Sequence, residues 1–559
     1  MSEGAEEGHG RAAFWGRLIG VALFLAIWLM PTPAGMSVPA QRLAAVTALM
    51  AVFWVTQAYA IVATSLFPLA LYPFLGILPA KEVCQAYISD SSFLYLGGFL
   101  IALGMERWHL HRRIALHIIC RTGSGPRQIV LGFMLATFVL SMWVSNTATT
   151  LMMLPIAIAL LTSLEDSLDH GPKLALQQDP AFRHLGQAVM LGIAYSATIG
   201  GVATPVGTPT NAAFLTIFAN QFPDAPRISA GQWMIAWVPF GIVFLGVAWL
   251  VLTWGLKRPP GFERFDRSFF RSRLTALGRA TRPELAMLAA FLAIAGLWIF
   301  RTDFSIGDTP LIPGWNRLVI AWLRSSGVTG ENQALGEYVN DAAVAMTVAL
   351  ILFLIPVRDP ASGRRVKLMD WRTARSVPWD ILFLFGGGFA IANAFQKTGL
   401  SIWAGQHLEV LGRDQPAIVV VAAVTLMMVF LTEFTTNVAT VAATMPLLAS
   451  LAVALEVDPR LLMVPATIAA SCGFMMPVGT PPNAIVFGTG RVRVECMAGY
   501  GAILNVVGMI LVVAATYLVM APTWNVRTNH NPDWAKPKAA QAIDSAAPAR
   551  SPMTPESVK

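Results

Sequence analysis

The stretch SNTAT at residues 145–149 recurs as TNVAT at residues 436–440, and a second motif recurs in the same order. That second motif is PVGTPTN at residues 205–211, which returns as PVGTPPN at residues 477–483. All four copies lie inside long apolar segments. Polar, Gly- and Pro-rich breaks at corresponding positions of two apolar halves are typical of transporters that bind their solute between two repeats. The pattern therefore predicts a duplicated membrane protein that binds an ion or a polar solute.

The composition is that of a protein embedded in a lipid bilayer. Of its 559 residues, 55% are hydrophobic and 13% are charged, whereas soluble domains carry about 25% charged residues. The net charge of +8 fits basic loops that fix orientation in a membrane better than nucleic-acid binding. The motif regions hold no cluster of His, Cys, Asp and Glu, and no GxSxG. We therefore expect a protein that is not an enzyme and that has no organic cofactor and no nucleic-acid partner.

Apolar runs of about 20 residues are long enough to cross a bilayer as helices. On this criterion we predict about eleven transmembrane helices, at residues 12–31, 41–58, 60–78, 92–107, 187–218, 231–256, 284–300, 337–356, 379–397, 460–490 and 501–522. Two further apolar stretches, 127–163 and 416–455, carry the Asn motifs near their middle. Non-helical backbone at membrane depth must be enclosed by protein or line a wet cavity, so we expect both to be re-entrant hairpins with the Asn at the tip.

The charged loops predict the orientation. Basic segments at 106–127, 257–282 and 358–375 fall on one side if the hairpins do not cross, whereas the connection 301–337 is balanced in charge. Positive loops stay inside, which predicts a multi-pass protein of the inner (plasma) membrane with a cytoplasmic N-terminus and an extracytoplasmic C-terminus. The two hairpins then open from opposite sides, so the two-fold repeat is inverted.

The predicted fold is an all-α polytopic membrane protein divided between scaffold helices and elements around the motifs. The expected segments are a cytoplasmic N-terminus (1–11), scaffold helices (12–91), first-repeat transport elements (92–218, with hairpin 127–163 and broken helix 187–218), scaffold helices with basic loops (219–378), second-repeat transport elements (379–490, with hairpin 416–455 and broken helix 460–490), a last helix (491–524) and a disordered tail (525–559). Glycine runs at 97–98 and 386–388 predict close helix packing, with a hinge as the alternative.

Uncharged oxygen atoms gather around each predicted hairpin tip. In the first half, Ser141 lies one helical turn before Ser145 and Asn146. The corresponding residues of the second half are Thr432, Thr436 and Asn437. Hydroxyl, amide and carbonyl oxygens without formal charge suit a hard monovalent cation, so we expect one Na⁺ site per half. The unwound Gly-Thr-Pro segments would add carbonyls to the cation shell, and the helix N-termini beside them would attract an anion placed between the halves.

These motifs resemble those of the divalent anion/sodium symporter family, which includes di- and tricarboxylate and sulfate carriers. The resemblance covers roughly residues 40–522 and includes Pro378-Trp379 leading into GGGF at 386–389. It implies a homodimer in which a transport domain moves as an elevator against a scaffold. It implies that substrate meets Ser145, Asn146, Thr147, Thr208, Thr436, Asn437, Val438, Thr480 and Pro481. It also implies one sodium site at Ser141, Ser145, Asn146 and Gly207, and another at Thr432, Thr436, Asn437 and Gly479.

Two positions of the second tip depart from the family pattern. Thr436 stands where Ser is usual, and it keeps the hydroxyl of the ion site. Val438 stands where bacterial members often have Thr, and it removes a hydrogen-bond donor from the substrate side.

We expect a secondary transporter that imports divalent organic anions, most readily C4-dicarboxylates such as succinate, with two or more Na⁺ ions. One alternative keeps the class but changes the solute to citrate, tartrate or sulfate, or replaces sodium coupling by anion exchange. A more distant alternative is a sodium/proton antiporter, in which Glu433 would be the titrating carboxylate.

Overall fold

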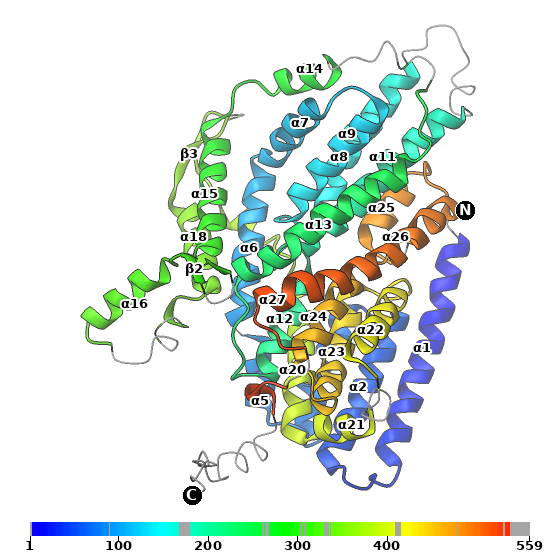
Figure 1. Cartoon of the computed structure of the whole chain (residues 1–559), viewed down its shortest axis with the longest axis vertical. Helices are drawn as coiled ribbons and strands as arrows, with labels where there is room; N and C mark the ends of the chain where they lie inside the picture. The colour runs from blue at the N-terminus through cyan, green and yellow to red at the C-terminus, as the bar shows by residue number, and fades with distance from the viewer. Residues whose placement is uncertain are drawn as a thin grey trace, which may run out of the picture.

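The structure is a computed structural model that describes residues 3–88, 90–166, 179–259, 262, 268–301, 304–306, 309–328, 335, 337–360, 362–408, 415–477, 479–528 and 531–536. The described chain is mostly helical (Figure 1). Short antiparallel pairs form between β1 (Phe304–Ile306) and β2 (Thr309–Ile312), and between β3 (Pro356–Arg358) and β4 (Arg365–Lys367).

The helices of the first half are α1 (Glu3–Leu29), α2 (Val38–Thr56), α3 (Ile61–Ser65), α4 (Phe67–Phe74), α5 (Ala80–Tyr87), α6 (Asp90–Arg107), α7 (Leu110–Thr122), α8 (Pro126–Ser141), α9 (Asn146–Asp166), α11 (Pro180–Val202), α12 (Pro209–Gln221) and α13 (Ala230–Thr253). The second half contains α14 (Ser268–Ala276), α15 (Arg282–Ile299), α16 (Asn316–Ser325), η2 (Glu337–Val339), α18 (Asp341–Leu354), α19 (Trp371–Ala374), α20 (Trp379–Thr398), α21 (Leu400–Leu408), α22 (Ala417–Thr432), α23 (Asn437–Ala454), α24 (Pro459–Ala470), α25 (Pro481–Phe487), α26 (Val494–Ala515), η4 (Thr516–Met520), α27 (Ala521–Thr523) and η5 (Asp533–Ala535).

Both predicted hairpins are pairs of helices joined by a short turn of four residues, 142–145 in the first half and 433–436 in the second. In the first half, α8 ends at Ser141 and α9 begins at Asn146; in the second half, α22 ends at Thr432 and α23 begins at Asn437. Ser145 caps α9, because its hydroxyl oxygen accepts a hydrogen bond from the amide of Ala148 at 3.3 Å. The Asn motifs therefore lie at the N-termini of two long helices.

Both Gly-Thr-Pro motifs interrupt a helix, as their residues predict. The first interruption separates α11 from α12, and the second separates α24 from α25. Pro209 and Pro481 each occupy the first position of the following helix, where a missing N–H group is tolerated. The interruptions expose backbone carbonyls and amides that an unbroken helix would use internally.

The two halves exchange their short helices. Helix α12 of the first half packs against α23 and α24, whereas α25 of the second half packs against α9 and α11. Figure 1 shows α12 among the second-half helices in the lower part of the molecule and α25 near the first-half hairpin in the upper part. Helix α11 is enclosed by this arrangement, since 94% of its most apolar stretch is buried. Each hairpin is thus held by a helix from the other half.

The glycine runs are places of close helix packing. A β-carbon at Gly97 would lie 2.6 Å from the β-carbon of Ala345, so α6 and α18 could not approach as they do. A β-carbon at Gly387 would lie 2.5 Å from the carbonyl oxygen of Ser65, between α20 and α3. Both contacts agree with the prediction that the glycine runs allow close helix packing.

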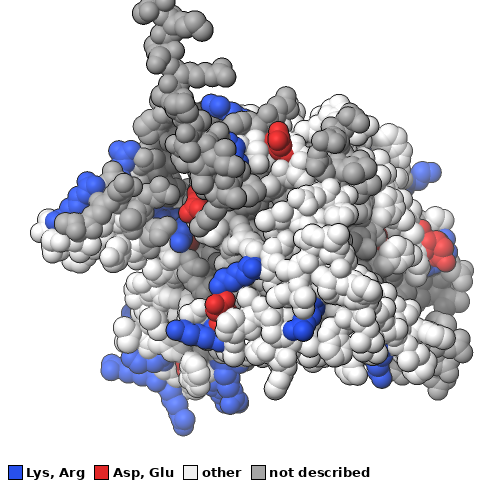
Figure 2. Space-filling model, turned by 90° about the horizontal axis from the view of Figure 1, so that it is seen from below, with Lys and Arg blue, Asp and Glu red and all other residues white. Residues whose placement is uncertain are grey.

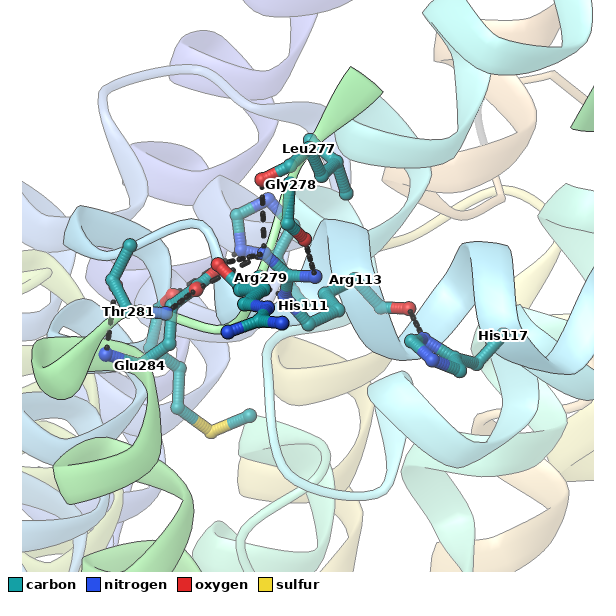
Figure 3. A network of polar contacts seen from close by, with 9 residues as sticks. His111, Arg113, His117, Leu277, Gly278, Arg279, Thr281 and Glu284 are labelled. Carbon is teal, nitrogen blue, oxygen red and sulfur yellow. Dashed lines mark hydrogen bonds and ion pairs between the residues drawn. The ribbon is translucent and has the colours of Figure 1, made fainter. Parts of the chain in front are cut away.

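The three basic segments meet at one end of the molecule. Arg113 of α7 donates to the carbonyl oxygens of Leu277 and Gly278 and pairs with Glu284 at 3.1 Å (Figure 3). On the same segment, Arg107 pairs with Asp370 at 2.7 Å, and the Trp108 indole donates to the carbonyl oxygen of Leu368. The contacting residues of segments 106–127, 257–282 and 358–375 therefore lie together, as the charge analysis predicts.

The predicted membrane spans are partly reproduced by the helices. Within the described ranges, eight helices are long and apolar enough to cross a membrane, and six shorter apolar helices accompany them. The expected single span at 60–78 is instead two helices, α3 and α4, which meet at Leu66, just before Pro68. Seen from below, much of the described surface carries no Lys, Arg, Asp or Glu (Figure 2).

Part of the expected disordered tail is ordered. Residues 525–528 and 531–536 are described, and the Trp534 ring lies 5.8 Å from that of Phe218 and 5.4 Å from that of Phe222. The Arg460 guanidinium lies 5.4 Å from the same indole ring, so an aromatic side chain holds the tail against α12 and α24. The rest of the predicted tail, 537–559, lies outside the described residues.

Candidate functional site

An oxygen cluster lies at the first hairpin tip. The Ser141 hydroxyl lies 2.8 Å from the side-chain amide of Asn146 and 2.6 Å from the carbonyl oxygen of Ala197. The same end of the Asn146 amide faces the carbonyl oxygens of Ala197 and Gly207 at 3.1 and 3.2 Å. Asn146 can approach because the α11 residue beside its amide is Gly201, where a side chain would collide with it. The cluster thus joins the hairpin to the end of α11 and to the break that follows it.

The second hairpin tip carries the same cluster. The Thr432 hydroxyl lies 2.8 Å from the Asn437 amide and 2.6 Å from the carbonyl oxygen of Ala470. The Asn437 amide faces the carbonyl oxygens of Ala470 and Gly479 at 3.2 and 3.1 Å. Each partner of the first cluster therefore has a counterpart in the second.

The orientation of the two asparagine amides decides what the clusters can hold. With nitrogen toward the cluster, Asn146 and Asn437 would each donate hydrogen bonds to the surrounding oxygens. With oxygen toward the cluster, hydroxyl, amide and carbonyl oxygens converge, and a cation between them would satisfy all four. The donors are uncharged and hard, which fits a monovalent cation such as Na⁺. Without a cation, nitrogen toward the cluster satisfies the surrounding oxygens, so the predicted cation sites require the opposite amide orientation and stay a prediction.

The loop behind the first cluster is anchored by a hydroxyl group. Thr204 donates to the carbonyl oxygen of Met142 and accepts from the amide of Gly207 at 3.0 Å. The Asn211 amide donates to the carbonyl oxygens of Gly201 and Val202 at the end of α11 and to that of Thr204 in the loop. These bonds hold the unwound backbone in place, so the Gly207 carbonyl stays directed toward the cluster.

The loop behind the second cluster is anchored by a carboxylate. Glu433 accepts hydrogen bonds from the backbone amides of Met475 and Met476, both at 2.9 Å. It also accepts from the side-chain amide of Asn505 on α26 at 2.6 Å. The Asn483 amide donates to carbonyl oxygens of the loop, as Asn211 does in the first half. Glu433 is therefore bound within the site rather than facing the lipid.

The remaining predicted residues divide between the clusters and their surroundings. Of the predicted ion ligands, Ser141, Asn146, Gly207, Thr432, Asn437 and Gly479 come together in the clusters. The Ser145 hydroxyl caps α9 instead, and the Thr436 hydroxyl is buried with no hydrogen-bond partner among the described residues. Thr147 and Val438 are half-buried in the first turns of α9 and α23. Thr436 thus has an unused hydroxyl at the predicted substrate side.

The Gly-Thr-Pro threonines are enclosed at the starts of the short helices. The hydroxyl of Thr208 lies 3.3 Å from that of Thr210, and the Thr480 hydroxyl accepts from the amide of Asn483 at 3.4 Å. Pro481 is exposed. Whether Thr208, Thr480 and Pro481 meet a substrate stays a prediction.

Sequence reasoning missed the carbonyl oxygens of Ala197 and Ala470, which belong to the clusters, and the residue Asn505. The two alanines contribute through their backbone, so their side chains carry no signal. Asn505 lies in a long apolar helix, and its polarity at that depth was the available signal.

Comparison with known proteins places the chain in a family. A family model described as the sodium:sulfate symporter transmembrane region matches residues 11–524. A sodium-dependent dicarboxylate transporter, SdcS, from Staphylococcus saprophyticus is 38% identical over 518 residues, which cover 91% of this chain and 92% of that protein. The SdcS protein of Staphylococcus aureus is 36% identical over 512 residues, covering 90% and 91%. With the duplicated oxygen clusters in place, we conclude that the chain belongs to the family of the sodium:sulfate symporter transmembrane region.

Proposed function

We propose that the protein imports C4-dicarboxylates, such as succinate, together with sodium ions. The observation that carries the proposal is the pair of matching oxygen clusters at the two hairpin tips. Sodium is a co-substrate in this proposal, and each cluster would take one ion. The names of the Staphylococcus relatives, sodium-dependent dicarboxylate transporters, support the same pairing of sodium with dicarboxylate.

The anion would bind between the two tips. Helices α9 and α23 begin at Asn146 and Asn437, so their N-terminal amides and positive dipole ends lie at the tips. Ser145 and Thr147 offer hydroxyls on the first tip, and Thr436 offers an unpartnered hydroxyl on the second. Cations bound in the neighbouring clusters would add positive charge, which would couple binding of the anion to sodium.

The proposal includes an elevator movement in a homodimer. The exchange of α12 and α25 between the halves ties both hairpins into one unit, which favours their movement as a single body. Helices of segments 12–91 and 219–378 would form the scaffold, and the hairpins would be re-entrant. The cytoplasmic end would be the face where Arg107, Arg113 and their partners lie.

Uptake of labelled succinate into proteoliposomes tests the proposal. We expect uptake with an inward sodium gradient and little uptake when potassium replaces sodium. Uptake that ignores sodium but requires an internal anion would establish an exchanger instead. If succinate is not taken up under either condition while sulfate or citrate is, the family assignment stands and the substrate proposal is wrong.

A further inference from the structure

The side chain that fixes each Gly-Thr-Pro loop against its hairpin comes from the loop in the first half and from the hairpin in the second half. In the first half, the loop residue Thr204 donates its side-chain hydroxyl to the backbone of the hairpin residue Met142. In the second half, the matching loop residue is Met476 and the matching hairpin residue is Glu433. There the hairpin side chain accepts from the loop backbone, at the amides of Met475 and Met476. One consequence is that a carboxylate stands at the second tip where a methionine stands at the first.

The Glu433 carboxylate is buried and is held by neutral groups. It is 3% exposed, and its described hydrogen-bond donors are two backbone amides and Asn505. Asn505 is fixed in turn, because its carbonyl oxygen accepts from the amide of Phe474 at 3.1 Å. Among the described residues no ion pair involves Glu433. A buried charge without a counter-charge is costly, so a cation nearby would stabilise it.

The carboxylate lies directly behind the second oxygen cluster. It follows Thr432, whose hydroxyl belongs to the cluster. A β-carbon at Gly479 would lie only 3.1 Å from Glu433 Oε2, and the Gly479 carbonyl oxygen belongs to the same cluster. At separations of a few ångströms in a poorly polarisable interior, the attraction between opposite charges is strong. The first cluster has the neutral side chain of Met142 at the corresponding position.

We propose that the negative charge of Glu433, which does not contact the ion, makes the second cation site bind Na⁺ more tightly than the first. Asn505 holds the carboxylate against the loop, so the charge acts through space while the Thr432, Asn437, Ala470 and Gly479 oxygens contact the ion. The inference rests on the proposed function, because it takes both clusters to be sodium sites. The second site would fill at low sodium concentration and the first site only as the concentration rises.

Two single-site variants of the full-length protein compare the sites without changing Glu433. Asn146→Ala leaves the second cluster, and Asn437→Ala leaves the first. The unfolding temperature of each purified variant is followed as sodium chloride replaces choline chloride at constant ionic strength. We expect half-saturation of the sodium-induced shift at a concentration at least about tenfold lower in Asn146→Ala than in Asn437→Ala.

Changes at Glu433 then separate its charge from its anchoring role. In the Asn146→Ala background, Glu433→Gln should raise the half-saturating sodium concentration about tenfold, whereas Glu433→Asp keeps the charge and should recover most of that loss. In the Asn437→Ala background, Glu433→Gln should change it by less than about twofold. Glu284→Gln removes another buried carboxylate, one paired with Arg113, and should leave sodium binding unaltered.

The outcomes distinguish this inference from the proposed function. Equal sodium affinities in the two single-site variants, or equal weakening of both sites by Glu433→Gln, would overturn the inference while sodium binding itself stands. Equal losses from Glu433→Gln and Glu433→Asp would also overturn it, because they would show an anchoring role without a charge effect. A wild-type protein that sodium does not stabilise more than choline would overturn both the inference and the proposed function.

Discussion

The two oxygen clusters have the same partners and nearly the same distances, yet the loops behind them are anchored differently. Ser141 and Thr432 each lie 2.8 Å from an asparagine amide and 2.6 Å from a carbonyl oxygen. Behind them, Thr204 anchors one loop with a neutral hydroxyl, and Glu433 anchors the other with a carboxylate. The comparison shows that the two repeats share the geometry of the oxygen cluster, whereas the groups that hold the loops behind the clusters differ in charge.

The largest expected effect comes from removing the amide shared by each cluster. Asn146→Ala and Asn437→Ala should each lower sodium-driven succinate uptake by at least about 100-fold, because the amide contacts every other member of its cluster. Uptake into proteoliposomes with equal protein insertion is the measurement. Asn316→Ala, in the distant helix α16, serves as the matched control. Normal uptake by both cluster variants would show that the clusters are not the transport site.

A smaller but asymmetric effect is expected at the two motif glycines. A β-carbon at Gly207 would lie 2.6 Å from the carbonyl oxygen of Gly201, whereas one at Gly479 would lie 3.1 Å from the Glu433 side chain. Backbone yields less than a side chain, so Gly207→Ala should destabilise the protein by about 1–3 kcal/mol and Gly479→Ala by less. Thermal unfolding of both variants in sodium-free buffer measures this. A larger loss of stability in Gly479→Ala than in Gly207→Ala would mean that the Glu433 side chain is held more rigidly than the backbone of the first loop.

The neutral anchor of the first loop can be removed without changing its size. Thr204→Val deletes the hydroxyl that bonds Met142 and Gly207, and leaves both of those groups unpaired in a buried place. The expected cost is about 1–3 kcal/mol of stability. Sodium titration should also show weaker sodium binding at the first site only, since the hydrogen bond that holds the Gly207 backbone in place is lost. Thr216→Val, a buried threonine that bonds only within its own helix, is the control.

The smallest effect is expected at the basic end, far from either cluster. Burial raises the pKa of Asp370, but hydrogen bonds from Thr373 and the charge of Arg107 outweigh it and hold the pKa below its ordinary value. The carboxylate side chain is 42% exposed, so Asp370→Asn should cost no more than about 1 kcal/mol at neutral pH. A lowered pKa gives stability that is present above the ordinary carboxyl pKa and is lost as pH falls through the lowered value.

The unfolding temperatures of Asp370→Asn and wild type should therefore differ at pH 7 and converge in acid, as the pH falls through the lowered pKa of Asp370. Succinate uptake should be unchanged at neutral pH. A difference that persists in acid would show that the aspartate stabilises the segment through its shape rather than its charge.

Local chemistry in the sequence determined where the helices are interrupted. Proline lacks an amide hydrogen, so Pro209 and Pro481 fix the starts of α12 and α25. The asparagine motifs fix the hairpin turns, which end α8 and α22 close to the predicted positions. The repeated order of these motifs was enough to predict a duplicated site with Ser141, Asn146, Thr432 and Asn437 at its centre.

Tertiary structure alone decided which groups surround those residues. Ala197 and Ala470 join the clusters through carbonyl oxygens, and a contact made by the backbone cannot be read from the residue type. The exchange of α12 and α25 depends on packing between segments far apart in the chain, which helical periodicity does not encode. The same holds for Asn505, which reaches Glu433 from another helix. Residue type fixes local geometry, but the charge and the partners around a site follow from contacts that only the folded chain creates.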